Sequence, residues 1–294
     1  MLPARLREAF AAQIRRMQFF SYPDVSFHSE GYHNAVFRVR SRGKDYAVRF
    51  SKSPALKKTV FVQYDYEKKV WGRVAALKIS PRVFKAGRVS IAGKVFPYSV
   101  QEFVAGRPLD QSRDLRLLAG SLRRLHEGTA GTGRGLHSTG DALDWIARQL
   151  DYYGERQYSK VPAAARKILR KAANSAYGPL VGRQSCRPCL VHNDLVAGNV
   201  VIAARRAAFV DWGWAMHSSP AIDLCCALSP FVTSWKKPFF VPDPAATGFI
   251  KVYSSGMSSG EKYALASDVL RLWDSYSAMV ACWILCDYAP HARS

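Results

Sequence analysis

The chain has 294 residues, of which 48% are hydrophobic and 22% charged, a composition typical of a globular protein with one large domain or two smaller ones. Lysine and arginine number 43 against 22 acidic residues, and the resulting formal net charge of +21 attracts anions without identifying which. No apolar run approaches the roughly 20 residues that cross a bilayer, so we expect no membrane span.

The first hundred residues alternate between helix and strand patterns. Apolar residues at steps of three and four over 1–20, interrupted by arginines, predict an amphipathic helix packed on its own domain rather than a signal peptide. Helical spacing over 59–77 predicts a second helix. The segments rich in β-formers are 27–50, with a turn at 41–44, and then 83–86 and 96–104.

Helical patterns dominate the remainder. The predicted helices carry apolar stripes over 115–125, 143–150 and 264–288, and the predicted short strands lie at 189–192, 200–203 and 208–210. The sequence therefore predicts an α+β protein with a small sheet-rich domain over 1–104, which includes the N-terminal helix, and a larger helical domain over 105–294.

The six cysteines indicate little about function. In a chain without a signal peptide, reduced thiols and a cytoplasmic location are the expectation. Cys186 and Cys189 form a lone C-x-x-C motif, which lacks the second pair that a structural zinc site requires. A local disulfide and a metal site stay open as alternatives at this motif.

One stretch carries chemistry. Leu190 to Asn199 reads L-V-H-N-D-L-V-A-G-N, and Asp211 follows the next predicted strand. Phosphoryl transfer to an alcohol needs a carboxylate that accepts the proton, and the phosphates of ATP need Mg²⁺, which prefers carboxylate and amide oxygens. We therefore predict Asp194 as the catalytic base and Asn199 and Asp211 as metal ligands.

This stretch resembles the catalytic and metal-binding motifs of the aminoglycoside phosphotransferase and choline kinase superfamily. The resemblance implies a two-lobed, protein-kinase-like fold, with a small antiparallel-sheet N-lobe and a larger, mainly helical C-lobe. It implies the same roles for Asp194, Asn199 and Asp211. It also implies that His192 helps to shape the catalytic loop and that Asp223, in the following helix, is structural.

The resemblance further implies a nucleotide site in the N-terminal domain. Its expected members are Gly31 and Asn34 of a phosphate-covering loop, Arg49 of the third strand, Glu67 of the next helix, and Gln101 and Phe103 of the hinge. The backbone C=O of Gln101 and N–H of Phe103 are expected to bind adenine. Lys44 and Lys52 are rivals of Arg49 for the phosphate-binding role. The helix segment that ends in His126 precedes the substrate region, and His126 itself is expected to be a packed residue.

We thus expect an ATP- and Mg²⁺-dependent kinase of a small hydroxyl compound, with choline or ethanolamine first and an aminoglycoside or a sugar still open. Aromatic faces bind quaternary ammonium groups, although tryptophans on apolar helices are also typical of a core. The candidate aromatic residues for such contacts are Trp212, Trp214, Trp235, Trp273, Trp283, Tyr152 and Tyr153.

The alternative functions are a protein or lipopolysaccharide kinase of related fold and a non-catalytic nucleotide-binding protein. Nucleic acid is not an expected partner despite the basic charge.

Overall fold

The computed structural model of the chain describes residues 2–31, 33–52, 58–152, 184–234 and 240–284. Two compact units make it up: Met1–Arg107 with Ala208–Gly213, and Pro108–Ala207 with Trp214–Ser294. The first unit therefore includes a short segment from the second half of the sequence, which carries Asp211. Of the helices in the described ranges, none is both long and apolar enough to cross a membrane.

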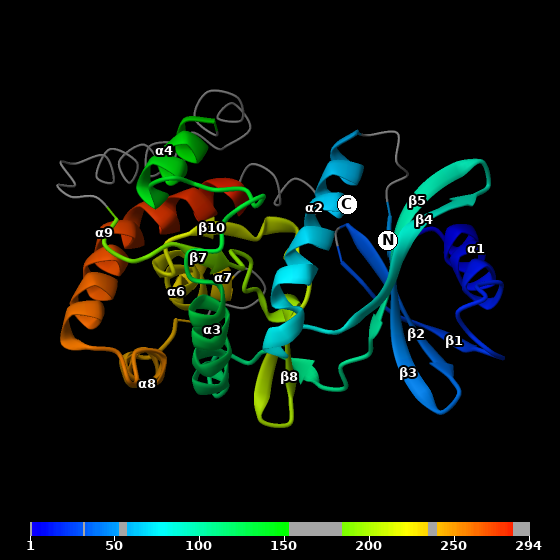
Figure 1. Cartoon of the computed structure of the whole chain (residues 1–294), viewed down its shortest axis with the longest axis horizontal. Helices are drawn as coiled ribbons and strands as arrows, with labels where there is room; N and C mark the ends of the chain where they lie inside the picture. Colours follow the sequence, from blue (N-terminus) through cyan, green and yellow to red (C-terminus); the bar gives the residue numbers. More distant parts are fainter. Residues whose placement is uncertain (1, 32, 53–57, 153–183, 235–239, 285–294) are drawn as a thin grey trace. The chain divides into compact units, whose positions relative to one another are not determined.

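A five-stranded antiparallel sheet forms the first unit, with the strand order β1-β2-β3-β5-β4 (Figure 1). The strands are β1 (Asp24–Glu30), β2 (Asn34–Ser41), β3 (Lys44–Ser51), β4 (Val83–Ile91) and β5 (Lys94–Glu102). Arg42 and Gly43 join β2 to β3 with positive φ angles of 50° and 71°. This is the backbone geometry that two-residue hairpin turns favour, and the turn lies where the sequence predicts it.

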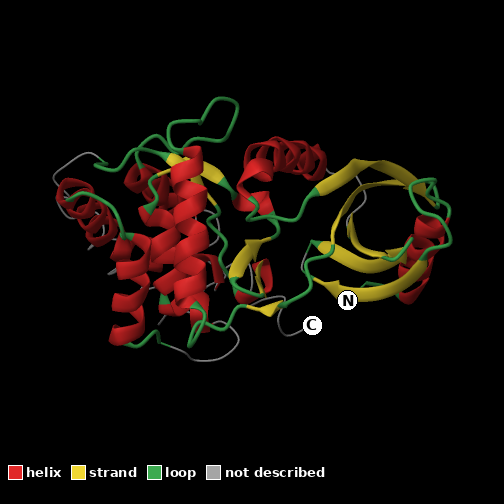
Figure 2. Ribbon diagram, turned by 60° about the horizontal axis from the view of Figure 1, so that its bottom comes forward, coloured by secondary structure: helices red, strands yellow, loops and turns green. Residues whose placement is uncertain are grey.

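Two helices cover opposite sides of this sheet, α1 (Ala4–Arg15) and α2 (Lys58–Val74), and a 3-10 turn, η1 (Ala75–Leu77), follows α2 (Figures 1 and 2). Side chains along a strand alternate between the two faces. In β3, Val48 and Phe50 belong to the core on the α1 side, whereas Arg49 reaches a glutamate on α2. The alternation of β3 thus separates an apolar face from a charged one.

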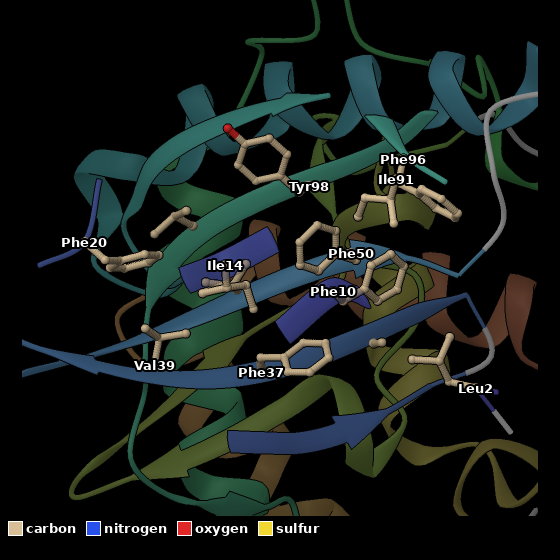
Figure 3. Packing of buried hydrophobic residues seen from close by; sticks show 13 residues of the cluster. Leu2, Phe10, Ile14, Phe20, Phe37, Val39, Phe50, Ile91, Phe96 and Tyr98 are labelled. Carbon is tan, nitrogen blue, oxygen red and sulfur yellow. The ribbon is translucent and has the colours of Figure 1, made fainter. Parts of the chain in front are cut away.

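The core under α1 is rich in aromatic rings (Figure 3). Phe10 of α1 is fully buried and stacks on Phe50, with ring centroids 4.4 Å apart. The rings of Phe37 and Phe96 contact the ring of Phe10 edge-on, with centroid distances of 6.3 and 5.1 Å. The N-terminal helix therefore packs on its own unit, as its amphipathic pattern predicts, and contributes a central residue of the core.

The second unit is mainly helical. Its helices are α3 (Leu115–Thr129), α4 (Ala142–Tyr152), α6 (Ala221–Leu228), α7 (Pro230–Ser234), α8 (Asp243–Tyr253) and α9 (Ser259–Trp283). The packing partners are α3 with α8, and α9 with α4, α6 and α7 (Figures 1 and 2). This helical framework positions the loop that carries the predicted base.

Short strands frame that loop. They are β6 (Arg107–Pro108), β7 (Cys189–Val191), β8 (Val200–Ala203), β9 (Arg206–Phe209) and β10 (Met216–Ser218), with 3-10 turns η4 (Ala197–Asn199) and η5 (Trp212–Trp214). β7 pairs with β10 in antiparallel register, with Leu190 opposite His217. The predicted catalytic loop runs from the end of β7 through η4 to the start of β8.

The predicted start of the last helix was too late. α9 begins at Ser259, behind a capping box in which Ser258 and Glu261 satisfy each other's backbone N–H groups. The first turn of the helix is polar, so the apolar spacing that begins at Ala264 does not reveal it. The predicted end of this helix, at residue 288, lies outside the described residues.

Truncating Phe10 tests the core of the first unit. We expect Phe10→Ala to lower the free energy of unfolding by about 3–5 kcal/mol, because a fully buried ring leaves a cavity between the sheet and α1. Phe84→Ala is the control, since that ring is 41% exposed, and it should cost much less. Urea unfolding of both variants measures the difference, and equal costs would contradict this account of the core.

Candidate functional site

Three charged side chains meet in the first unit. The guanidinium of Arg49 on β3 donates to both carboxylate oxygens of Glu67 on α2, at 2.5 and 3.0 Å. The same guanidinium donates to Asp211 at 3.1 Å. The side chains of Arg49 and Glu67 are only 15% and 4% exposed, whereas that of Asp211 is 37% exposed. Arg49 is therefore fixed between two carboxylates, one buried and one accessible.

Burial and charge oppose each other within this cluster. Burial raises the pKa of Glu67, and the positive charge of Arg49 works against that increase. Burial alone would lower the pKa of Arg49, but the charges of Glu67 and Asp211 outweigh it and raise that pKa above its usual value. Arg49 is consequently a permanent cation in a fixed orientation, which suits it to binding an anionic group.

The loop between β1 and β2 is held by the residue that follows β3. The Lys52 ammonium donates to the carbonyl of Gly31 at 3.0 Å, and its backbone N–H donates to the carbonyl of His33 at 2.8 Å. Asn34 then extends its amide to Asp211 at 3.4 Å. Lys52, a rival of Arg49 in the sequence, thus supports the predicted phosphate-covering loop from its base. A side chain at Gly31 would point into open space.

The predicted hinge residues lie at the end of β5. Gln101 is buried and pairs with Ala47 of β3, and its side-chain amide donates to Ser99 at 2.9 Å. The backbone N–H of Phe103 makes a long contact of 3.4 Å with the carbonyl of Asp45. The guanidinium carbon of Arg38 lies over the ring of Phe103, 4.8 Å from the centre of that ring. The adenine-binding role of this segment stays a prediction.

The turn after β9 has a constrained backbone. Asp211 has a φ of 61°, in the left-handed region that non-glycine residues rarely adopt. The next residue, Trp212, is anchored by its buried indole N–H, which donates a hydrogen bond to the hydroxyl of Ser80 at 3.0 Å. At Gly213, a methyl group would collide with the side-chain amide of Gln63 and crowd the carboxylate of Glu67. Glycine at this position leaves room for the helix α2 side chains beside Asp211.

The second cluster lies in the predicted catalytic loop, within the second unit. The side-chain amide of Asn199 donates to a carboxylate oxygen of Asp194 at 2.6 Å and to its backbone carbonyl at 3.1 Å. Asn193 has a φ of 59°, again in the left-handed region. Its side-chain oxygen accepts a hydrogen bond from the Tyr276 hydroxyl at 3.2 Å. Asn199 therefore orients the carboxylate of Asp194, and Tyr276 holds the residue that precedes it.

A buried carboxylate fixes the backbone of this loop. Asp223 of α6 accepts the backbone N–H of His192 at 2.8 Å with one oxygen and that of Asn193 at 2.7 Å with the other. The side chains of Asp223 and His192 are both fully buried. His192 therefore belongs to the packing around the loop, and only the next residues turn toward the surface.

An open pocket lies beside Asp194 within the second unit. It encloses about 670 Å³ of empty space, a value that includes its open mouth. Its polar lining groups include Gln149, Asn193 and Asp194. Its aromatic and sulfur-containing walls come mainly from α4, α7 and α9 and from η5: Trp145, Trp214, Phe231, Tyr276, Met279 and Trp283.

The sequence identified only part of this pocket. Trp214 and Trp283 line it, whereas Trp212 is a buried residue of the first unit. Trp145 and Tyr276 were missed, because each lies within an apolar helical stripe that is equally typical of a core. Tyr153 and Trp235 lie outside the described residues.

None of the described cysteines takes part in a disulfide bond. Burial raises the pKa of Cys186 to about 12, and the neighbouring Asp268 adds to this effect. Cys226 lines the pocket, and its sulfur accepts the backbone N–H of Leu195 at 3.4 Å. In the described part of the chain, no three His, Cys, Asp or Glu side chains form a cluster that could hold a metal ion. Within the described residues, the C-x-x-C motif belongs to no such cluster.

A comparison with protein families gives a match over most of the chain. The profile described as the phosphotransferase enzyme family matches residues 24–257. No curated protein sequence matches the chain significantly.

Solved structures of similar fold include three kinases of small molecules. A spectinomycin phosphotransferase in complex with ADP and spectinomycin has a TM-score of 0.61 at 12% identity, with 98% of this chain and 90% of that chain covered. A choline kinase from Cryptosporidium parvum has a TM-score of 0.62 at 13% identity and coverage of 98% and 91%. A microcompartment-associated aminopropanol kinase has a TM-score of 0.62 at 14% identity and coverage of 97% and 98%. These matches confirm the expected two-lobed, protein-kinase-like α+β fold.

The buried ion pair of the first unit gives a stability prediction. We expect Glu67→Gln to lower the free energy of unfolding by about 3 kcal/mol, because Arg49 would stay buried with only Asp211 to balance its charge. Asp65→Asn on the same helix is the control. It breaks an exposed pair with Arg88 and should cost less than about 1 kcal/mol. Urea unfolding compares the two variants, and similar losses would show that the buried pair has no special weight.

Proposed function

Since the chain belongs to the phosphotransferase enzyme family, we propose that it transfers the γ-phosphate of ATP to a small alcohol in a magnesium-dependent reaction. It is a phosphotransferase that acts on hydroxyl groups, in the aminoglycoside phosphotransferase and choline kinase superfamily. The observation that carries this proposal is the carboxylate of Asp194. It is fixed by Asn199 and lies at the wall of an aromatic pocket. A hydroxyl group bound in that pocket can therefore meet a base that is already oriented.

Asp194 has the geometry of a general base. Its carboxylate accepts a hydrogen bond from Asn199, and an ionised carboxylate can accept several hydrogen bonds, including one from the hydroxyl of a substrate. As the alcohol oxygen bonds to the γ-phosphorus, the bond from that phosphorus to the bridging oxygen of ADP breaks, and the hydroxyl proton passes to Asp194. Positioning of the hydroxyl in line with the phosphate is the main contribution of the residue.

Asn199 and Asp211 are the proposed metal ligands. An amide oxygen and a carboxylate are hard donors of the kind that Mg²⁺ prefers, and this ion commonly takes only one or two carboxylates from the protein, with phosphates and water completing its coordination. A bound Mg²⁺ would neutralise charge that develops on the phosphates. The 37% exposure of the Asp211 side chain supports this role, since the carboxylate is open on one side.

Arg49 and the loop of Gly31 and Asn34 are the proposed phosphate contacts. The guanidinium of Arg49 is held by Glu67, so its orientation costs no further ordering when an anion arrives. Gln101 and Phe103 are the proposed adenine-binding residues. The ADP bound to the spectinomycin phosphotransferase supports ATP as the donor in this chain as well.

The pocket supports a substrate with an apolar or quaternary ammonium group. Aromatic faces attract such cations by about 0.5–2 kcal/mol each. Trp145, Trp214 and Trp283 come from three separate elements, and Asp194 supplies a negative charge in the same pocket. We therefore propose choline or ethanolamine as the first substrates to test, with sugars and aminoglycosides as the comparison.

Replacing the base tests the reaction. We expect Asp194→Asn to lower kcat by about 10²–10⁴-fold while the affinity for ATP stays within a few-fold of wild type, because the amide cannot accept the proton. Asp144→Asn, an exposed change on α4, is the matched control and should leave kcat unchanged. A coupled assay of ADP release gives both values. Retention of more than half of the wild-type kcat by Asp194→Asn would refute the assignment.

Replacing the ligands tests the metal. We expect Asp211→Ala to weaken the binding of Mg-ATP more than Asn199→Ala does, since a charged ligand is lost in one case and a dipole in the other. Removal of Asp211 also takes away one of the two carboxylates that Arg49 contacts, so the calorimetry should include ATP without Mg²⁺. A metal role requires that the loss in Asp211→Ala appear only with Mg²⁺ present. Equal loss with and without the ion would assign the effect to Arg49 instead.

An acceptor panel tests the substrate. We expect choline or ethanolamine to increase ADP release, and Trp145→Leu to raise the KM for choline. The neutral isostere 3,3-dimethylbutanol is the matched control, because it keeps the shape of choline and lacks the charge. Turnover of a sugar alone would overturn the choline assignment and leave the kinase assignment intact. Labelling of a protein in place of every small alcohol would favour a protein kinase.

A further inference from the structure

Besides the two backbone N–H groups of the loop, the carboxylate of Asp223 contacts a third group. The ring of His126, on α3, contacts the same oxygen that accepts the His192 N–H, at 3.0 Å from Nε2. Asp223 is fully buried and His126 is 4% exposed, so water does not compete for these bonds. Because both oxygens of Asp223 already accept backbone N–H groups, Nε2 of His126 is the donor in this contact.

The other ring nitrogen of His126 continues the chain of bonds. Nδ1 lies 2.7 Å from the hydroxyl of Tyr253, which is the last residue of α8 and only 1% exposed. Burial raises the pKa of Tyr253 well above its usual value, so the hydroxyl keeps its proton and can donate a hydrogen bond to Nδ1 of His126. The contact with the hydroxyl of Tyr253 therefore helps to fix the orientation of the His126 ring.

We propose that Tyr253 and His126 are positioning residues, which act through Asp223 to hold the backbone of the catalytic loop in its working conformation. The loop needs this support, because Asn193 adopts a left-handed φ of 59° directly before Asp194. Three donors around one buried carboxylate stabilise that conformation, and the series runs Tyr253, His126, Asp223, then the peptide groups of His192 and Asn193.

The inference rests on the proposed catalytic role of Asp194, so its test has one readout that needs activity and one that does not. Tyr253→Phe removes a single hydroxyl. We expect kcat to fall about five- to tenfold with the KM for ATP within twofold of wild type, because the loop that holds the base is loosened and the first unit is unchanged. His126→Leu should lower kcat more than His126→Gln does, since the amide of glutamine can still donate a hydrogen bond to Asp223.

The second readout is hydrogen exchange of the backbone N–H groups in segment 190–196. We expect Tyr253→Phe and His126→Leu to accelerate exchange there, and His126→Gln to restore part of the protection in comparison with His126→Leu. If the wild-type protein phosphorylates no acceptor, the proposed function fails, and exchange still decides whether the series of bonds holds the loop.

Thr139→Val is the matched control. It removes a buried hydroxyl pair with Ser218, 2.9 Å apart in the same unit, and Ser218 lies opposite Cys189, one residue before segment 190–196. We expect it to lower the melting temperature while kcat and exchange in 190–196 stay at wild-type values. The proposal is overturned if Tyr253→Phe behaves like this control, with lower stability but unchanged kcat and unchanged exchange in the loop.

Discussion

Burial of a carboxylate is tolerated only where hydrogen-bond donors replace the water that it loses, and Asp223 meets this condition with three N–H groups. Two of them belong to the peptide backbone at His192 and Asn193, and the third to the ring of His126. One carboxylate therefore fixes α3, α6 and the predicted catalytic loop with respect to one another. Asp194 follows these residues directly, so its position depends on a charge that lies entirely inside the second unit.

The first unit uses a different solution for its buried charge. Arg49 lies between Glu67 and Asp211, and the pair with Glu67 is almost completely shielded from water. The sheet makes this arrangement possible, because the neighbours of Arg49 on β3 point to the aromatic core on the other face. An apolar core on one side thus supplies the rigidity, and a fixed cation on the other side supplies the charge. The stability of this unit and the proposed binding of phosphate by Arg49 consequently depend on the same strand.

The sequence predicted the features that depend on near neighbours in the chain. Helical stripes, the turn at 41–44 and the motif around Asp194 are patterns within a few residues. The pocket walls were harder to predict, because Trp145 and Tyr276 come together from distant helices and each has the spacing of a core residue. His126 was expected to be packed, and it is buried. However, its partners lie 97 and 127 positions along the chain, and no spacing rule connects them.

The sulfur of Cys226 has a consequence for the chemistry that the pocket tolerates. Burial raises the pKa of this thiol to about 12, so the sulfur keeps its proton at neutral pH. Electrophiles and oxidants attack the thiolate, and the aromatic walls therefore surround a sulfur atom that behaves as an inert apolar group. The pocket can keep its shape through changes in cellular redox state, and alkylating reagents should leave it unmodified as long as the unit stays folded.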